Sequence, residues 1–257
     1  MPDPNAVAQT LRRAIDERTE IERLTATIPD LDLETAYAAQ WSGIRDRVAQ
    51  GEQLVGLKLG LTSRPKQVTM RVDSPLYGYL TSGMLLDAFQ PLPLDRFIHP
   101  RVEPEIAFLI RDELSGPVSI ADVLDATAGV CAALEVIDSR YAAFRFTLPD
   151  VVADNASAAG YYVGPRLIPA HELEDLRLLG VVLRKDGEIA HTAAGAAVMG
   201  HPAAAIAWLS QRLALVGRSI PAGSLVLSGA LTDAIPVGPG SSVVAEFDGL
   251  GTIEVRA

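Results

Sequence analysis

Over the first fifty residues, apolar and polar positions alternate with the period of an α-helix. Apolar residues fall on one face of such a helix at Ala6, Val7, Leu11 and Ile15. A second helical stretch begins at Leu33 and extends to about Gln50, with Asp30 or Asp32 placed to act as its N-cap. The pattern therefore predicts a helical N-terminal arm over residues 1–53.

From Leu54 onward, short apolar runs broken by glycine and proline replace the helical spacing. Runs of this kind between turn residues are typical of β-strands. The predicted strands are 54–59, 106–110, 134–137, 161–163, 179–183, 225–227, 243–247 and 252–255. Turn residues at 185–188 and at 248–249 predict two hairpins. We therefore expect a β-rich core over residues 54–257.

Two helices are expected to interrupt this core. One runs from Ser119 to about Gly129 and opens with a Ser-x-x-Asp pattern that resembles a capping box. The other starts near Pro202 and ends near Leu215, with Gly217 just past its end. The sequence thus predicts an α+β fold in which a helical arm precedes one mixed, β-rich core.

The composition narrows the class of protein. Of the 257 residues, 49% are hydrophobic and 21% are charged, which is enough apolar material for a sizeable core. The formal net charge is −10 and no Lys/Arg-rich run occurs, so nucleic acid and anionic membrane are poor candidate partners. An anionic substrate would need a local cationic site. Because Cys131 is the only cysteine, an intramolecular disulfide and a cysteine-based zinc site are excluded.

No targeting or membrane segment is expected. Residues 1–13 lack the apolar centre of a signal peptide. The most apolar later stretch, 193–209, is interrupted by Gly200-His201-Pro202 and does not have the pattern of a membrane span. These features predict a cytoplasmic protein.

Two carboxylates stand two positions apart in the segment 101–108, which continues as an apolar run. In an extended strand, Glu103 and Glu105 would point to the same face. Two adjacent anions repel each other, and a hard divalent cation such as Mg²⁺ or Mn²⁺ would relieve the repulsion. The simpler alternative is a half-exposed strand with a polar face.

Other charged residues stand in apolar or glycine-rich surroundings. Lys58, in the segment 56–62, would hold an ammonium in a confined place, although by itself a solvated strand lysine is the simpler interpretation. Glu135 lies in an apolar run and needs a cation, a hydrogen-bond network or exposure. Arg140 is placed to pair with a local acid, and the polar cluster 154–157 is compatible with a plain turn.

Several short segments in order carry a family resemblance. They are 56–62 (Gly-x-Lys-x-Gly-Leu-Thr), 75–78 (Pro-Leu-Tyr-Gly), 100–105 (Pro-Arg-Val-Glu-Pro-Glu), 133–140 (Ala-Leu-Glu-Val-Ile-Asp-Ser-Arg), 154–157 (Asp-Asn-Ala-Ser), 195–203 and 221–224. Together they resemble the 2-keto-4-pentenoate hydratase/4-oxalocrotonate decarboxylase group of the fumarylacetoacetate hydrolase superfamily, over nearly the whole chain.

This resemblance implies a mixed β-sheet roll of the fumarylacetoacetate hydrolase C-terminal type. It implies Glu103, Glu105 and Glu135 as ligands of Mg²⁺ or Mn²⁺ and Lys58 as the catalytic lysine, with no organic cofactor. The chain departs from the family at Pro104, where a small or β-branched residue is expected. Because proline removes a backbone donor, this position should be an edge, an end or a bulge.

The resemblance also points to one branch of the group. Hydratases carry an acid at the position of Leu76, whereas decarboxylases carry an aliphatic residue, and the segment 133–141 with Phe144 and Phe146 also favours the decarboxylases. Substrate contacts are expected at four residues: Leu76, Arg140, Asp154 and Ser157. The implied reaction is decarboxylation of 2-oxohex-3-enedioate, a small anionic 2-oxo dicarboxylate, in meta-cleavage degradation of aromatic compounds.

Two alternatives stay open, a 2-hydroxypenta-2,4-dienoate hydratase and a catalytically silent assembly subunit. The presence of Lys58 and all three glutamates argues against silence. The resemblance further implies a homo-oligomer and allows a complex with the downstream hydratase.

Overall fold

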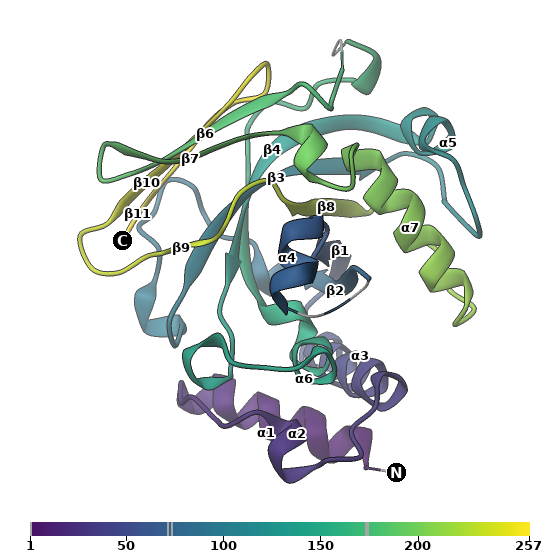
Figure 1. Cartoon of the computed structure of the whole chain (residues 1–257), viewed down its shortest axis with the longest axis vertical. Coiled ribbons are helices and arrows are strands. Elements are labelled where there is room, and N and C mark those ends of the chain that lie inside the picture. Colours follow the sequence, from purple (N-terminus) through teal and green to yellow (C-terminus); the bar gives the residue numbers. More distant parts are fainter. Residues whose placement is uncertain (1, 71, 73, 173–174) are drawn as a thin grey trace.

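The computed structural model describes residues 2–70, 72, 74–172 and 175–257, and Figure 1 traces the whole chain. The helices are α1 (Pro4–Glu17), α2 (Leu24–Thr27), α3 (Leu33–Ala49), α4 (Arg64–Met70), α5 (Ile120–Asp125), α6 (Leu148–Ala153) and α7 (Pro202–Ala214). The first strands are β1 (Leu54–Gly60), β2 (Leu76–Thr81), β3 (Arg101–Ile110), β4 (Thr127–Ile137) and β5 (Ala158–Val163). The later strands are β6 (Gly180–Lys185), β7 (Glu188–Ala194), β8 (Leu225–Ala230), β9 (Ile235–Pro236), β10 (Ser242–Phe247) and β11 (Gly251–Arg256).

The strands form two sheets. The larger sheet has the order β2-β1-β8-β3-β4-β5, and β9 pairs with β3 beside it. Within it β1 and β8 run parallel, whereas β3 and β4 pair antiparallel along their whole length, so the sheet is mixed. The smaller sheet has the order β11-β10-β6-β7. The predicted α+β fold with a mixed sheet is confirmed.

The N-terminal arm packs directly on the large sheet through α3 and also contacts α6. The Tyr37 ring of α3 stacks on the Tyr77 ring of β2, with ring centres 4.7 Å apart, and Gln40 Nε2 donates to the Tyr77 carbonyl. Figure 1 shows α1, α2 and α3 grouped with α6 at one end of the molecule, and the smaller sheet at the other end. Val7 and Leu11 of α1 share a buried cluster with Val151 and Val152 of α6. Asp32 caps α3, because its side chain accepts a hydrogen bond from Thr35 N, as one of the two predicted caps requires. The boundary at residue 53 stays a prediction, since the arm and the core share this apolar cluster.

The predicted helix from Ser119 to about Gly129 is too long. The capping box at Ser119 is present, but α5 ends at Asp125, and Thr127 and Gly129 already pair with β3 as the start of β4. Sheet pairing overrides the local helical pattern there. Both predicted hairpins are confirmed, joining β6 to β7 and β10 to β11. The short helices α2, α4 and α6 and the strands β2, β7 and β9 were not among the predicted elements.

Pro104 lies inside β3. The backbone N–H that proline lacks would point to the side of β3 where no strand is paired at this position. The β8 ladder on that side begins at Glu105 and shifts register immediately after it, and the β9 ladder ends at Val102. The Pro104 carbonyl accepts a hydrogen bond from Leu231 N, which lies between the two ladders. The expectation of an end or a bulge therefore holds on one side of β3, while the other side pairs continuously with β4.

In the described part of the chain, every helix is too short or too polar to cross a lipid bilayer.

Candidate metal and active site

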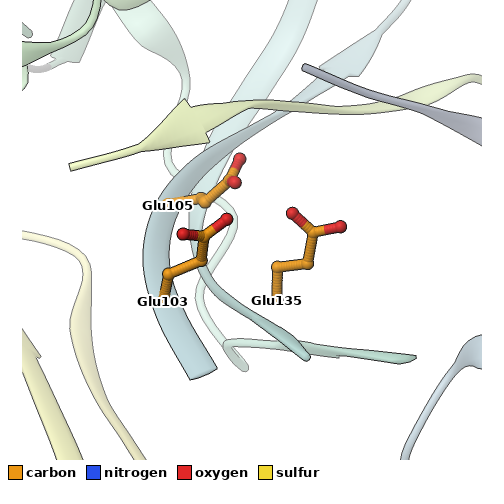
Figure 2. A group of neighbouring side chains, drawn as sticks. All are labelled: Glu103, Glu105 and Glu135. Carbon is orange, nitrogen blue, oxygen red and sulfur yellow. The ribbon is translucent and has the colours of Figure 1, made fainter. Parts of the chain in front are cut away.

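Three glutamates converge on the large sheet (Figure 2). Glu103 and Glu105 point to the same face of β3, and the antiparallel register puts Glu135 of β4 directly opposite Glu103. One carboxylate oxygen from each lies within 4.8 Å of the others. The relative exposure is 7% for Glu103 and 0% for Glu105 and Glu135, so the alternative of a half-exposed polar face is wrong.

Burial and mutual repulsion make this cluster unfavourable on its own. Burial, followed by the charges of Glu135 and Glu103, raises the pKa of Glu105 well above its usual range. Burial likewise raises the pKa of Glu135 to about 7. Glu105 Oε1 and Glu135 Oε1 have no hydrogen-bond partner among the described residues. Buried carboxylate oxygens without donors, close enough to share one ligand, fit a hard divalent cation.

Gly229 supports Glu105, one of the two fully buried carboxylates. Its backbone N–H donates to Glu105 Oε2 over 2.7 Å. The glycine has a φ of 110°, and a Cβ there would lie 2.2 Å from Thr62 Oγ1. Only glycine fits a backbone that takes this conformation and approaches Thr62 so closely.

Lys58 is the cation beside the three glutamates. Its side chain is 2% exposed, Nζ lies 3.0 Å from Glu135 Oε2, and it donates a hydrogen bond of 3.1 Å to the Ala156 carbonyl. Burial lowers the pKa of Lys58, but the charges of Glu135, Glu103 and Glu105 outweigh it and leave the pKa raised, so the ammonium keeps its proton. The solvated-lysine alternative is therefore wrong. Gly56 packs closely on β8, where a Cβ would lie 1.8 Å from the Leu225 carbonyl oxygen.

A cavity of about 640 Å³ opens beside this group. Lys58 and Glu103 line it, and so do two of the predicted substrate contacts, Leu76 and Ser157. The Ser157 hydroxyl is buried and has no hydrogen-bond partner in the described structure. The larger apolar side chains that line it include Leu61, Leu76, Ile137, Phe144, Phe146 and Val151. The cavity thus combines charged groups with an apolar surface.

The predicted contacts Arg140 and Asp154 do not line this cavity. They form a buried ion pair through Arg140 Nε, at 4% and 1% side-chain exposure. Arg140 Nη2 also donates to the Asp154 carbonyl over 2.7 Å. Local pairing, the alternative considered for Arg140, is what the geometry favours, and substrate contact by either residue stays a prediction.

The segment between this ion pair and the cavity has an unusual backbone. Asn155, Ala156 and Ser157 have φ values of 50°, 55° and 58°. A non-glycine residue in this left-handed region costs about 1 kcal/mol or more, and single residues rather than runs usually adopt it. The polar cluster 154–157 is therefore a strained loop held by its surroundings rather than a plain turn.

Two cations at the cavity were missed from the sequence. Arg101 lines the cavity, and its guanidinium carbon lies 4.1 Å from the centre of the Phe144 ring. Lys66 of α4 also lines it, with Nζ 3.5 Å from Glu103 Oε2 and a hydrogen bond of 2.8 Å to the Thr232 carbonyl. The two-residue period that aligned Glu103 with Glu105 also aligns Arg101 with them, so that residue could have been found. Lys66 lies on a helix that the pattern did not indicate.

Comparison with known proteins identifies the family of this chain and similar enzymes. The chain matches the family described as Fumarylacetoacetate (FAA) hydrolase C-terminal over residues 48–257, and it belongs to that family. It is 41% identical to a 4-oxalocrotonate decarboxylase from Pseudomonas sp. (strain CF600), over 98% of this chain and 95% of that one. It is also 35% identical to a 2-oxo-hept-4-ene-1,7-dioate hydratase from Escherichia coli, over 97% and 96% of the two chains.

A solved relative extends the likeness to three dimensions. The 4-oxalocrotonate decarboxylase from Pseudomonas putida G7, complexed with magnesium and adipate, has a TM-score of 0.95 and 38% identity, covering 98% of this chain and 96% of the other. The predicted resemblance to the hydratase and decarboxylase group is confirmed, because relatives of both kinds match over nearly the whole chain.

Proposed function

We propose that this protein is a divalent-metal-dependent carbon–carbon lyase that converts 2-oxohex-3-enedioate to 2-hydroxypenta-2,4-dienoate and CO₂ in meta-cleavage degradation of aromatic compounds. The observation that carries the proposal is the buried group of Glu103, Glu105, Glu135 and Lys58 beside a cavity with an apolar surface at Leu76. Full-length similarity to 4-oxalocrotonate decarboxylases supports it.

The three glutamates would hold Mg²⁺ or Mn²⁺, and no organic cofactor is needed. Their unpartnered oxygens and their spacing support this ligand set, as does the magnesium in the solved relative. When bound, the cation would supply Lewis-acid chemistry that draws electrons toward the 2-oxo group of the substrate. Three carboxylates, one divalent cation and the Lys58 ammonium sum to zero charge, so the centre itself would not repel an anionic substrate.

The chain's own residues would do the remaining work. As the bond to the distal carboxylate breaks, its electrons pass through the C3=C4 double bond to the 2-oxo oxygen, giving a dienolate. Lys58 lines the cavity as a buried ammonium, so it would neutralise the developing negative charge and donate a proton to that oxygen. Ser157, whose hydroxyl has no other partner in the described residues, would hydrogen-bond the substrate.

Lys66 and Arg101 would act when the substrate enters the cavity, whereas Leu76 would act when CO₂ is released. Lys66 and Arg101 would attract the dianionic substrate into the cavity, for which the adipate of the solved relative is a precedent. Leu76 is 2% exposed and offers no hydrogen bond from its side chain, so a carboxylate facing it is poorly solvated. Conversion of that carboxylate to neutral CO₂ is then favoured.

The test is an assay of CO₂ release from 2-oxohex-3-enedioate by the purified protein, with and without Mg²⁺. We expect release that a chelator abolishes and Mg²⁺ or Mn²⁺ restores. Leu76→Asp should impair release, because a second anion would repel the distal carboxylate. Full activity in metal-free buffer would refute the metal-dependent mechanism.

A hydratase acting on 2-hydroxypenta-2,4-dienoate is the second candidate, favoured by 37% identity to a 2-keto-4-pentenoate hydratase from Burkholderia vietnamiensis (strain G4 / LMG 22486). A hydratase must position and activate water, which Leu76 cannot do, since its side chain accepts no proton. Efficient hydration without CO₂ release by the unmodified protein would decide for the hydratase.

A third possibility, a catalytically silent assembly subunit, would show neither reaction. A homo-oligomer, a complex with the downstream hydratase and a cytoplasmic location remain predictions of the family resemblance.

A further inference from the structure

The strained loop Asn155–Ser157 contacts Lys58 directly. The Ala156 carbonyl accepts the hydrogen bond from Lys58 Nζ, at 3.1 Å. Lys58 has one other near polar partner among the described residues, the Glu135 carboxylate. The position of the ammonium therefore depends on a backbone carbonyl that belongs to an energetically unfavourable left-handed segment.

Asn155 fixes this segment to the strand next to Lys58. Its Oδ1 accepts from Tyr79 N over 2.8 Å, and its Nδ2 donates to the Tyr79 carbonyl over 2.9 Å. This pair of bonds satisfies both backbone groups of one β2 residue. Because β2 is the neighbour of β1, with Gly78 paired to Lys58, the loop is attached one residue from the lysine's own partner.

Gly78 makes this close attachment possible. A Cβ at that position would lie 2.6 Å from the Asn155 carbonyl oxygen and 3.0 Å from Asn155 Oδ1. At the other end of the loop, Asp138 N donates to the Ser157 carbonyl over 2.9 Å, and Arg140 holds Asp154. The loop is thus tied on both sides of Ala156.

We infer that Asn155 is a positioning residue for Lys58, seated against Gly78 and holding the Ala156 carbonyl where it orients the ammonium toward the cavity. Asn155 itself does not line the cavity, so it acts through Lys58 and not on the substrate. The inference rests on the proposed function, in which Lys58 serves the charge-developing step.

A double-mutant cycle tests the coupling. Asn155→Ala should lower kcat about 10-fold or more, with KM and the Mg²⁺ concentration for half-activation changed less than about 3-fold. In a Lys58→Met background, Asn155→Ala should change the residual kcat by less than about 2-fold, because the group it positions is gone. Asn5→Ala is the matched control, since Asn5 accepts a side-chain hydrogen bond from Ser42 in the arm and lies far from the loop in sequence.

Gly78→Ala would place a Cβ on β2 against Asn155 and displace the same loop, so it should also lower kcat. Thermal unfolding and Mg²⁺ titration of each variant identify any that fails to fold. A crystal structure of Asn155→Ala gives a readout without activity, with the Lys58 Nζ to Ala156 O separation expected to exceed hydrogen-bond length.

The experimental results distinguish a failure of the positioning role of Asn155 from a failure of the proposed reaction. A wild type that hydrates and does not decarboxylate refutes the proposed reaction, and the same cycle is then measured on hydration. Equal losses from Asn155→Ala in both backgrounds, or an effect on KM or metal affinity alone, would overturn the positioning role.

Discussion

Two groups of buried charges lie on either side of the loop Asn155–Ser157, and they differ in how their polar atoms are satisfied. Asp154 and Arg140 neutralise each other, and the arginine also donates to the Asp154 carbonyl. The three glutamates of the metal site face the ammonium groups of Lys58 and Lys66, and Glu105 Oε1 and Glu135 Oε1 have no hydrogen-bond partner in the described chain. Both groups are equally hidden from water, so burial alone does not distinguish them.

A buried charge whose polar atoms are not satisfied therefore indicates the reactive site, whereas burial of a charge by itself does not. A self-neutralised pair needs nothing from outside, and removing one partner leaves a lone buried ion. A surplus of carboxylates is stable only with a cation from outside, so its residues should affect metal binding and turnover more than folding. Substitutions in the two groups should therefore change different measurements.

The largest effect is expected from breaking the satisfied pair. Arg140→Met leaves the Asp154 carboxylate buried without a cation and should lower the free energy of unfolding by about 3–5 kcal/mol, measured by urea denaturation. Arg12→Met, which breaks the exposed Arg12–Asp16 pair, is the control and should change stability little. A stable Arg140→Met variant with a raised KM would instead support the substrate contact first predicted for Arg140.

Lys58→Ala, in contrast, should affect turnover more than it affects the free energy of unfolding. Turnover at saturating Mg²⁺ should fall about 10²-fold or more, because the variant loses the group that neutralises charge and transfers a proton. Steady-state kinetics and a metal titration check the separation between turnover and metal affinity. A strong shift in metal affinity with unchanged turnover would make Lys58 a structural residue.

Removing one metal ligand should act mainly on metal affinity. Glu105→Gln and Glu103→Gln should each raise the Mg²⁺ concentration for half-activation by roughly 10-fold or more. Calorimetric titration with Mg²⁺ measures this without turnover. Glu113→Gln, outside the cluster, is the control. If both ligand variants bind Mg²⁺ as the wild type does, the glutamates are not the ligands.

The smallest effect is expected from replacing Arg101, a partly exposed charge that lines the cavity. Arg101→Met should raise KM for the dianionic substrate by roughly 3- to 10-fold and leave kcat less affected, because a partly exposed charge attracts the substrate through screening solvent. Arg145→Met, an exposed arginine outside the cavity lining, should leave KM unchanged. Equal KM values for the two variants would remove Arg101 from substrate attraction.

Features that depend on local geometry could be predicted from the sequence. The period of an extended strand put Glu103 and Glu105 on one face, and helical spacing predicted α3 with Asp30 or Asp32 as its cap. Residues a few positions apart along one element have fixed relative directions, so no knowledge of the fold was needed. The glycine after Pro202–Ala214 and the two hairpin turns belong to the same kind of signal.

Contacts between residues that are distant in the sequence depend on the fold and could not be predicted. The β3–β4 register put Glu135 opposite Glu103, and the loop after α6 brought the Ala156 carbonyl to Lys58, 98 positions away along the chain. The same pairing ended α5 at Asp125, because backbone hydrogen bonds to β3 outweighed a local preference for helix. The charges of Lys58, Arg140 and the glutamates are written in the sequence, but which of them are neutralised depends on contacts that only the folded chain makes.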